Sequence, residues 1–148
     1  MNWTKLPVAA TLAATLIASP ATAYADPVPT TDEVLAIMAE LTDPNIPAAN
    51  KGDIVAPGFT PEEAGTIDDH LNRMKNLLPL PSVVTDIEPA PNNLAGATVE
   101  TNGGPRQGRR PRPIVLVDQG GHWLITHDSA TEETDGVWRV ANRFIGGI

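Results

Sequence analysis

The stretch PIVLVDQGGHWLITH, residues 113–127, decides the fold of this chain. Two runs of strand-forming residues flank a short turn from Gln119 to Gly121. A connection this short joins neighbouring antiparallel strands, so the stretch predicts a β-hairpin. Trp123 alternates with Ile125 on one face of the second strand, and its bulk predicts core packing, with pocket lining as the alternative.

Two helices are expected before the sheet. Thr30 with Glu33, and Thr60 with Glu63, have the spacing of a capping box, in which side chain and backbone satisfy each other. Apolar residues then recur at helical intervals, and we expect the helices to end before prolines at 44 and 79. After Pro81 the period changes to that of strands. The expected strands are 82–87, 95–101, 113–118 and 122–127.

This order of elements predicts an α+β fold with two N-terminal helices packed on a curved four-stranded antiparallel sheet. Val137, Val140, Ala141 and Phe144 have helical spacing and predict a short C-terminal helix. The expected core comprises Ile67, Leu71, Met74, Ile87, Val115, Leu116, Val117, Trp123, Leu124 and Ile125.

Residues 1–25 have the pattern of a cleavable signal peptide. Lys5 precedes an uncharged run, Leu6 to Ala18, which is too short to cross a bilayer as a helix. Small residues at alternate positions then favour cleavage after Ala25, and the alternative is an uncleaved anchor on the membrane surface. We therefore expect a secreted protein, not an integral membrane protein, in which 26–148 form a single α+β domain.

The composition excludes several classes of function. The 148 residues include 10 Lys and Arg against 18 Asp and Glu, a net charge of −8, and no Cys. The absence of cysteine excludes disulfides, thiolate metal sites and thiol nucleophiles. The acidic balance argues against nucleic acid as the main partner, because phosphate binding needs a basic face.

An arginine-rich segment, residues 103–112, lies at the predicted tip between the second and third strands. Its glycines and prolines predict an exposed loop. Guanidinium groups on such a loop can bind an anionic envelope lipid or polymer, and the alternative is a loop that is simply solvated. The candidate ligand-binding residues are Arg106, Arg109, Arg110 and Arg112.

Several runs resemble, in their shared order, the low-molecular-weight secreted (culture-filtrate) antigen family of mycobacteria. The resemblance covers roughly residues 30–130. The runs that carry it are LTDPN (41–45), ANKG (49–52), IDDH (67–70), LPLP (78–81), VTDIEP (84–89) and VDQGGHW (117–123).

The resemblance implies export, one small domain, and a cone-like shape similar to the nuclear-transport-factor-2 and cystatin-like folds. It implies no catalytic residues and no cofactor, so none is assigned from it. Two places depart from the family pattern: the arginine-rich loop 105–113 and the tail after Ala130, which carries Trp138 and Arg143.

Asp69 and His70 form the best candidate for an acid–base pair. His70 lies at the margin of the apolar face of the second helix, so in a cone-shaped fold it could face the cavity with Asp86 or Asp118. The alternative is a histidine at the helix–sheet boundary that is held by one partner. Asp69, His70 and Trp123 are therefore the pocket candidates.

No metal site and no triad are expected. His122 and His127 lie five positions apart on one predicted strand, and this odd spacing places them on opposite faces. Asp128 and Ser129 follow His127, but adjacent residues of an extended chain cannot align a nucleophile with its base.

The sequence therefore predicts a secreted, non-enzymatic binding or interaction module of the cell envelope or extracellular space. One alternative is a small-molecule enzyme that uses a cone-shaped cavity, with His70 and an aspartate as acid and base. Another is an envelope-associated domain that binds anionic lipid or polysaccharide through the arginine loop. An open pocket that holds His70 and a carboxylate would favour the enzyme.

Overall fold

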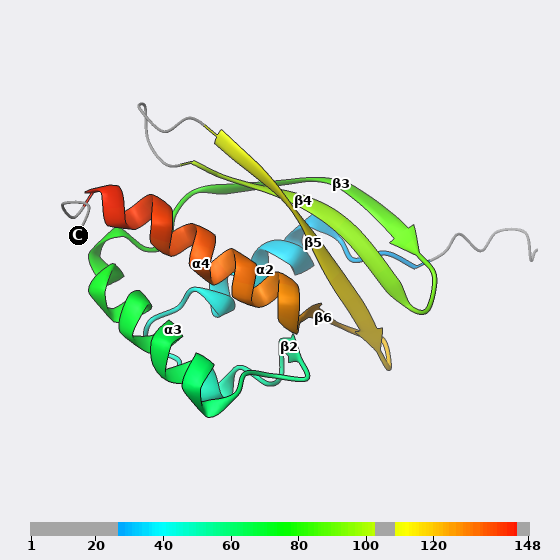
Figure 1. The fold of residues 1–148 in the computed structure, drawn as a ribbon. Coiled ribbons are helices and arrows are strands. Elements are labelled where there is room, and N and C mark those ends of the chain that lie inside the picture. Colours follow the sequence, from blue (N-terminus) through cyan, green and yellow to red (C-terminus); the bar gives the residue numbers. More distant parts are fainter. Residues whose placement is uncertain (1–26, 103–108, 145–148) are drawn as a thin grey trace, which may run out of the picture.

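The computed structural model describes residues 27–102 and 109–144, and of Asn102, Arg109, Arg110 and 140–144 only the backbone. The predicted signal peptide and Arg106 lie outside the described residues, so cleavage after Ala25 stays a prediction. The described residues form an α+β fold with three α-helices and a five-stranded sheet in the order β2-β6-β5-β4-β3 (Figure 1).

Both predicted N-terminal helices are present, as α2 (Thr31–Leu41) and α3 (Pro61–Arg73). Each begins with the predicted capping box. The Thr30 hydroxyl accepts a hydrogen bond from the Glu33 backbone N–H at 3.1 Å, and the Glu33 carboxylate accepts one from the Thr30 N–H at 2.9 Å. These bonds satisfy N–H groups that the first helical turn leaves without a partner.

The second helix is shorter than the apolar period predicts. It ends at Arg73, and a 3₁₀ turn, Lys75–Leu77, follows. Pro79 explains the difference, because it lacks an N–H, its ring collides with the carbonyl four residues earlier, and the residue before it disfavours the helical conformation. The turn brings Leu78 against the same apolar cluster as Leu71.

The sheet differs from the prediction in having a fifth strand and mixed direction. The two-residue strand β2 (Val55–Ala56) pairs with β6 in parallel, whereas the other pairs are antiparallel as predicted. The predicted strands are present with wider bounds, as β3 (Ser82–Ala90), β4 (Leu94–Asn102), β5 (Arg109–Gln119) and β6 (His122–Thr126).

The predicted hairpin joins β5 to β6 through a two-residue turn. Gly120 and Gly121 have φ values of 66° and 84°, a left-handed conformation that glycine adopts without steric cost. The Asp118 carboxylate accepts a hydrogen bond from the Gly121 backbone N–H at 2.8 Å. This turn fixes the register in which Gln119 pairs with His122.

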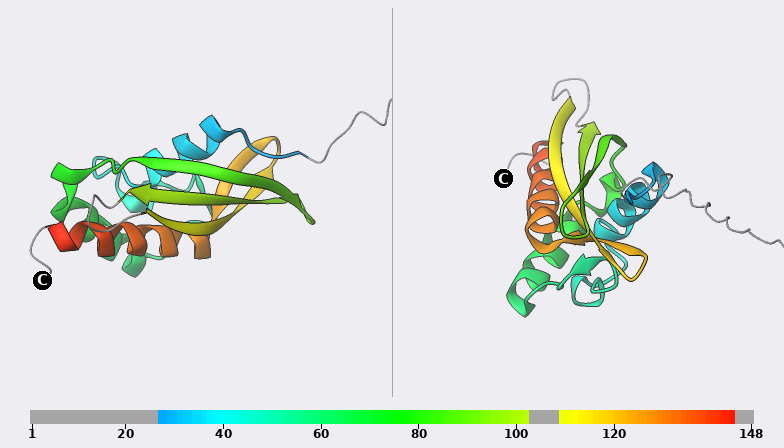
Figure 2. Two further views of the ribbon diagram at one scale, coloured as in Figure 1. Left: turned by 90° about the horizontal axis from the view of Figure 1, so that it is seen from above. Right: turned by 90° about the vertical axis from the view of Figure 1, so that its right-hand side faces the viewer.

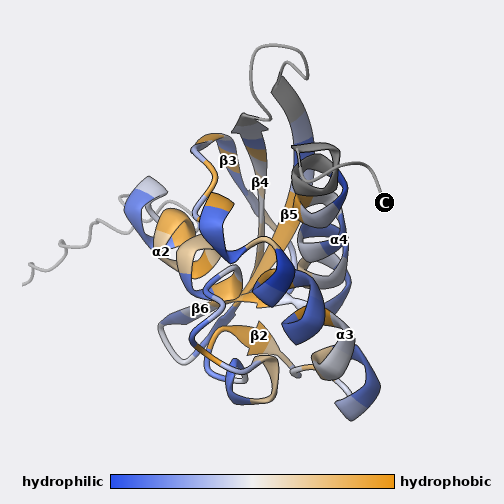
Figure 3. Ribbon diagram, turned by 90° about the vertical axis from the view of Figure 1, so that its left-hand side faces the viewer, coloured by the Kyte–Doolittle hydropathy of each residue, from blue (hydrophilic) through white to orange (hydrophobic). Residues whose placement is uncertain are grey.

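The sheet arches over the helices. α2 lies under the β3 side, α4 (His127–Phe144) lies alongside β5, and α3 packs below α4 (Figures 1 and 2). The apolar residues line the inside of this arch, where α2 meets the sheet (Figure 3).

Most of the core lies on the inner face of the sheet, and this corrects part of the predicted core. Ile114 and Leu116 of β5 face the helices and are 1% and 0% exposed, whereas Val115 between them is 39% exposed. The alternation of a strand gives the physical reason, since no helix covers the outer face at Val115. Ile87 and Val117 are half-buried. The prediction is confirmed for Ile67, Leu71, Met74, Leu116, Trp123, Leu124 and Ile125.

The C-terminal helix is much longer than predicted, because it begins at His127 rather than near Val137. Its buried face carries Ala130, Glu133, Thr134 and Val137. Two of these four are polar, so a search for apolar residues at helical intervals misses the first half of the helix. The Ser129 hydroxyl accepts a hydrogen bond from the Val115 backbone N–H at 2.9 Å, just past the end of β6.

A buried lysine closes the end of α2. Lys51 is fully buried, and its ammonium group donates hydrogen bonds to the carbonyls of Leu41 at 2.7 Å and Asp43 at 3.1 Å. Burial lowers the pKa of Lys51, and Asp68 opposes this effect. The contacts satisfy carbonyls that the last helical turn leaves free.

Leu71→Ala should lower the free energy of unfolding by about 2–5 kcal/mol. Leu71 is 1% exposed in the apolar cluster that α3 forms with Ala48 and Val137, so its truncation leaves a cavity. Urea denaturation measures the change. Val115→Ala is the control and should change stability by no more than about 0.5 kcal/mol, as at other surface sites. A loss for Leu71→Ala as small as the control would contradict the packing of α3.

Candidate functional site

A cavity of about 170 Å³ opens between α2, α4 and the chain that enters β3. Its walls are mainly apolar and come from segments far apart in the sequence. They comprise Leu35, Met38, Ala39 and Thr42 of α2, Leu78, Pro79 and Leu80 of the connection, Ser82 of β3, Thr101 of β4 and Val137 of α4. A cavity of about 150 Å³ with apolar walls is enough to take up benzene, so this one can hold a small apolar molecule.

Three hydroxyl groups make up the polar part of the cavity wall. Thr42 donates to the Met38 carbonyl at 2.9 Å, and Ser82 donates to the Leu80 carbonyl at 3.3 Å. Thr101, which is 2% exposed, accepts a hydrogen bond from the Arg112 guanidinium at 3.2 Å. The cavity wall holds no carboxylate, imidazole or amine among the described residues.

Behind Thr101 lies a bidentate ion pair between β5 and α4. Arg112 donates from Nε to Oε1 of Glu133 at 2.8 Å and from Nη2 to Oε2 at 3.1 Å. The Glu133 side chain is 1% exposed and that of Arg112 20%. Such a fork-to-fork pair fixes both geometry and charge, and its loss would leave a buried carboxylate without a partner.

Gly136 makes room for this ion pair. A Cβ atom at this position would lie 2.9 Å from Cζ and 3.0 Å from Nε of Arg112. Glycine is a poor helix former, so its place inside α4 is explained by the close approach of the guanidinium.

A second polar contact connects the start of α4 to the start of α3. The His127 ring contacts the Glu63 carboxylate at 2.8 Å and the Asp128 carboxylate at 3.2 Å. The hydrogen bond to Glu63, followed by that to Asp128, raises the pKa of His127. The Thr60 backbone N–H, and then His127, lower the pKa of Glu63.

His70 lies in a separate groove between α3 and α4, not in the cavity under the sheet. Its ring stacks on Trp138 with centroids 4.2 Å apart and planes 3° apart. The groove is lined by Glu62, Glu63, Thr66, Ile67, His70, Thr131, Thr134 and Asp135. His70 therefore lines a pocket together with carboxylates, as the acid–base alternative expects. This pocket is the groove between α3 and α4 rather than a cone-shaped cavity under the sheet, because Ile67 and Leu71 turn that edge of α3 toward α4.

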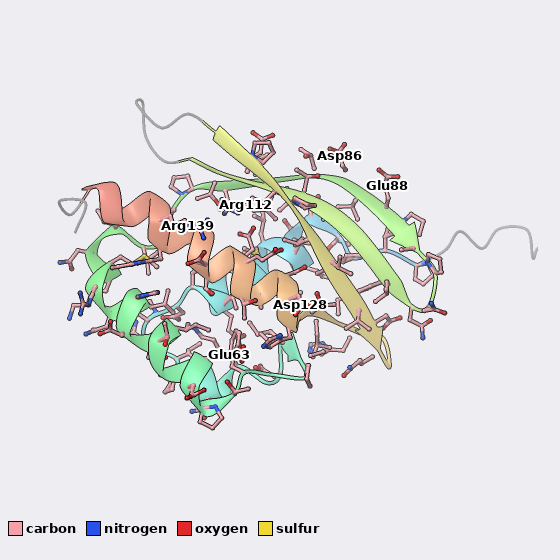
Figure 4. The ribbon with its side chains drawn as sticks, viewed as in Figure 1. Glu63, Asp86, Glu88, Arg112, Asp128 and Arg139 are labelled. Atoms are coloured by element: carbon pink, nitrogen blue, oxygen red, sulfur yellow. The ribbon has the colours of Figure 1, made fainter. Side chains whose placement is uncertain are left out.

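The carboxylates expected beside His70 are engaged or distant. Asp69 pairs with Arg73 at 3.1 Å on the surface of α3. Asp86 lies at the bulge of β3, on the outer side of the strand (Figure 4). Asp118 holds the β5–β6 turn. Trp123 belongs to the core, as predicted, and does not line the cavity.

The arginine segment is only partly the exposed loop that its composition predicts. Arg109, Arg110 and Arg112 lie in β5, and Arg109 pairs with Asn102 at the far end of the β4–β5 ladder. Arg112 is committed to Glu133, which corrects its assignment as a free anion-binding residue. Anion binding by Arg106, Arg109 and Arg110 stays a prediction.

Sequence reasoning missed Thr101, Glu133, Gly136 and the His127–Glu63 contact. Ala130, Glu133 and Val137 recur at helical intervals. This spacing predicts the buried face of α4 once Glu133 is counted as a buried residue that is paired inside the protein. Within residues 27–102 and 109–144, no group of three metal-binding side chains lies close together. None of the helices in these ranges is both long and apolar enough to span a membrane.

Comparisons with known proteins agree with the resemblance. Residues 27–134 match the family described as "Low molecular weight antigen MTB12, C-terminal domain". The chain is 36% identical over 112 residues to Low molecular weight antigen MTB12 of Mycobacterium tuberculosis, which covers 74% of this chain and 66% of that relative. The Mycobacterium leprae homologue of MTB12 is 30% identical over 107 residues, or 71% of this chain and 64% of the relative.

A more distant relative in Mycobacterium tuberculosis carries a lipoprotein designation, LppK. It is 25% identical over 109 residues, which make up 70% of this chain and 57% of the relative. The matches thus span about two thirds or less of the relatives' own length.

Gly136→Ala should lower the free energy of unfolding by about 1–3 kcal/mol. The new methyl group would displace a guanidinium that Glu133 and Thr101 hold in place, which outweighs the better helix propensity of alanine. Urea denaturation measures the change. The control is Gly65→Ala in α3, where nothing lies within 4 Å and stability should rise by up to about 1 kcal/mol. Stabilisation by both substitutions would contradict the role of Gly136.

The His127–Glu63 contact should contribute stability mainly between about pH 4.5 and pH 6.5. The folded pKa of His127 lies above its ordinary 6.5, so its contribution is complete below that pH and is lost as pH rises through the folded pKa. The folded pKa of Glu63 lies below its ordinary 4.5, so its contribution is lost as pH falls through that lower value. Urea midpoints of the wild type and Glu63→Gln from pH 5 to pH 8.5 test this. Glutamine keeps the capping box, so the advantage of the wild type should shrink toward pH 8.5. Parallel curves would contradict the assignment.

Proposed function

This chain belongs to the Low molecular weight antigen MTB12, C-terminal domain family, and on that premise we propose that it is a non-enzymatic binding module of the cell envelope or extracellular space. Its ligand is a small apolar molecule held in the cavity between α2, α4 and the sheet. The observation that carries the proposal is the composition of the cavity wall, which is apolar apart from three hydroxyl groups.

The shape and lining of the cavity support binding. Ligand sites are typically concave and mostly apolar, with a few polar groups that orient the ligand. Leu35, Met38 and Val137 supply the apolar surface from two helices, and Thr101 supplies a buried hydroxyl from the sheet. Because the wall is built from elements that the core already fixes, the cavity exists without a ligand to shape it.

The chemistry of the cavity favours binding over catalysis. General acid–base catalysis needs a titratable group within hydrogen-bond reach of the substrate. The described wall offers only hydroxyl groups, and no histidine or carboxylate stands beside them as an activating base. His70, the best acid–base candidate of the sequence, belongs to the other groove, where it stacks on Trp138.

An exported location is part of the proposal. Residues 1–25 have the pattern of a signal peptide, and the relatives are named as an antigen and as a lipoprotein. A module that meets small apolar molecules in the envelope would use the cavity rather than the charged outer surface. The detection of Asp26 as the N-terminus of exported protein, by mass spectrometry, would support this location.

Benzene should bind in the cavity, because its size suits a space of about 170 Å³. A titration followed by NMR should shift the methyl signals of Leu35 and Val137. Ala39 is exposed and lines the cavity, so Ala39→Phe places a ring at the cavity opening and should reduce benzene affinity at least about tenfold by obstructing it. Ala36→Phe is the matched control, because Ala36 is also exposed on the same helix but does not line the cavity. Equal binding by both variants would refute the assignment.

A further inference from the structure

The polar side of the cavity offers one hydrogen-bond donor that the protein leaves poorly used. Thr101 accepts a hydrogen bond from Arg112 at 3.2 Å, so the hydroxyl hydrogen of Thr101 points elsewhere. Among the described residues, its partner is the Ser82 oxygen at 3.5 Å, well beyond the usual 2.7–2.8 Å for two oxygens. The other two hydroxyls, on Thr42 and Ser82, already donate to backbone carbonyls.

Among the described side chains, the charges on this side of the cavity cancel. Arg112 lies behind Thr101, but its positive charge is matched by the carboxylate of Glu133 through two hydrogen bonds. Both carboxylate oxygens of Glu133 are occupied by the guanidinium, so neither is free to receive a cation. The pair polarises the Thr101 hydroxyl and strengthens it as a donor, since hydrogen bonds in a chain reinforce one another.

We propose that the cavity selects a small, uncharged, mainly apolar molecule that carries a carbonyl oxygen, such as a ketone or an ester, and that Thr101 donates the hydrogen bond that recognises this oxygen. The inference rests on the proposed function, because it names the ligand class of the same cavity. Leu35, Met38 and Val137 contact the apolar part of the ligand.

Charged ligands are disfavoured by desolvation. A carboxylate loses its water on entering an apolar cavity, and the described cavity wall offers it one hydroxyl group but no unpaired cation. An ammonium group finds no free carboxylate, because Glu133 is paired. The sequence alone favours anionic ligands through Arg112, whereas the ion pair with Glu133 reverses that preference at this site.

The test compares four six-carbon probes of equal length on the full protein: hexane, 2-hexanone, hexanoate and hexylamine. NMR titrations at pH 7 follow the Leu35 and Val137 methyl signals. We expect 2-hexanone to bind about fivefold to tenfold more tightly than hexane, the factor that one hydrogen bond supplies. Hexanoate and hexylamine should bind at least about tenfold more weakly than 2-hexanone.

Two variants assign the preference to Thr101. Thr101→Val keeps the shape of the side chain without the hydroxyl, and it should reduce 2-hexanone binding to the level of hexane. Thr101→Ser keeps the hydroxyl and should retain the preference for the ketone. Thr98→Val is the matched control, because Thr98 lies in the same strand but does not line the cavity, and it should leave the preference for the ketone unchanged.

The outcomes separate the two proposals. Hexanoate binding as tightly as 2-hexanone, or equal binding of hexane and 2-hexanone, would overturn the inference and leave the proposed apolar binding function in place. Binding by none of the four probes would overturn both. If Thr101→Val fails to fold, the ranking of probes on the wild type and Thr101→Ser still decides the ligand class.

Discussion

The bidentate contact between Arg112 and Glu133 is the interaction on which the rest of this structure depends. It joins the middle of β5 to the inner face of α4 across an otherwise apolar interior. A buried carboxylate costs several kcal/mol unless it is paired with good geometry, so α4 is held in one orientation. Gly136 is the local consequence, since a side chain there would collide with the guanidinium.

The ion pair also holds α4 beside an open edge of the sheet. β6 has only five residues, so much of the edge of β5 has no strand beside it. An open edge exposes backbone groups that invite other chains to pair. α4 lies alongside this edge, and Ser129 accepts the hydrogen bond of the first N–H past the end of β6. Arg112 then continues the contact one turn further along the helix (Figure 4).

The cavity follows from the same arrangement. With α4 held against β5 and α2 packed under β3, the sheet arches over a space that the side chains do not fill completely. Next to Thr101 in its polar wall, the charges of Arg112 and Glu133 cancel each other. Titratable groups gather instead where α3 meets α4, around Glu63, His127 and His70. The apolar cavity and the cluster of titratable groups are thus separated in this fold.

The local structure can be predicted from the sequence. The capping boxes at Thr30 and Thr60 and the glycine turn before His122 depend on residues within a few positions of one another, and the alternation of strand residues is visible in the sequence itself. The α+β class and the antiparallel order of the four main strands follow from these elements and their short connections.

Only the tertiary structure decided which polar residues are buried. Because Glu133 and Thr134 are polar although buried, apolar periodicity does not predict the first half of α4. The burial of Glu133 is tolerated because Arg112, 21 residues away in the sequence, neutralises its charge. Likewise His70 faces α4 rather than the sheet because of how α3 packs. The side chain of a charged residue is placed by its partner, and partners distant in sequence are brought together only when the chain has folded.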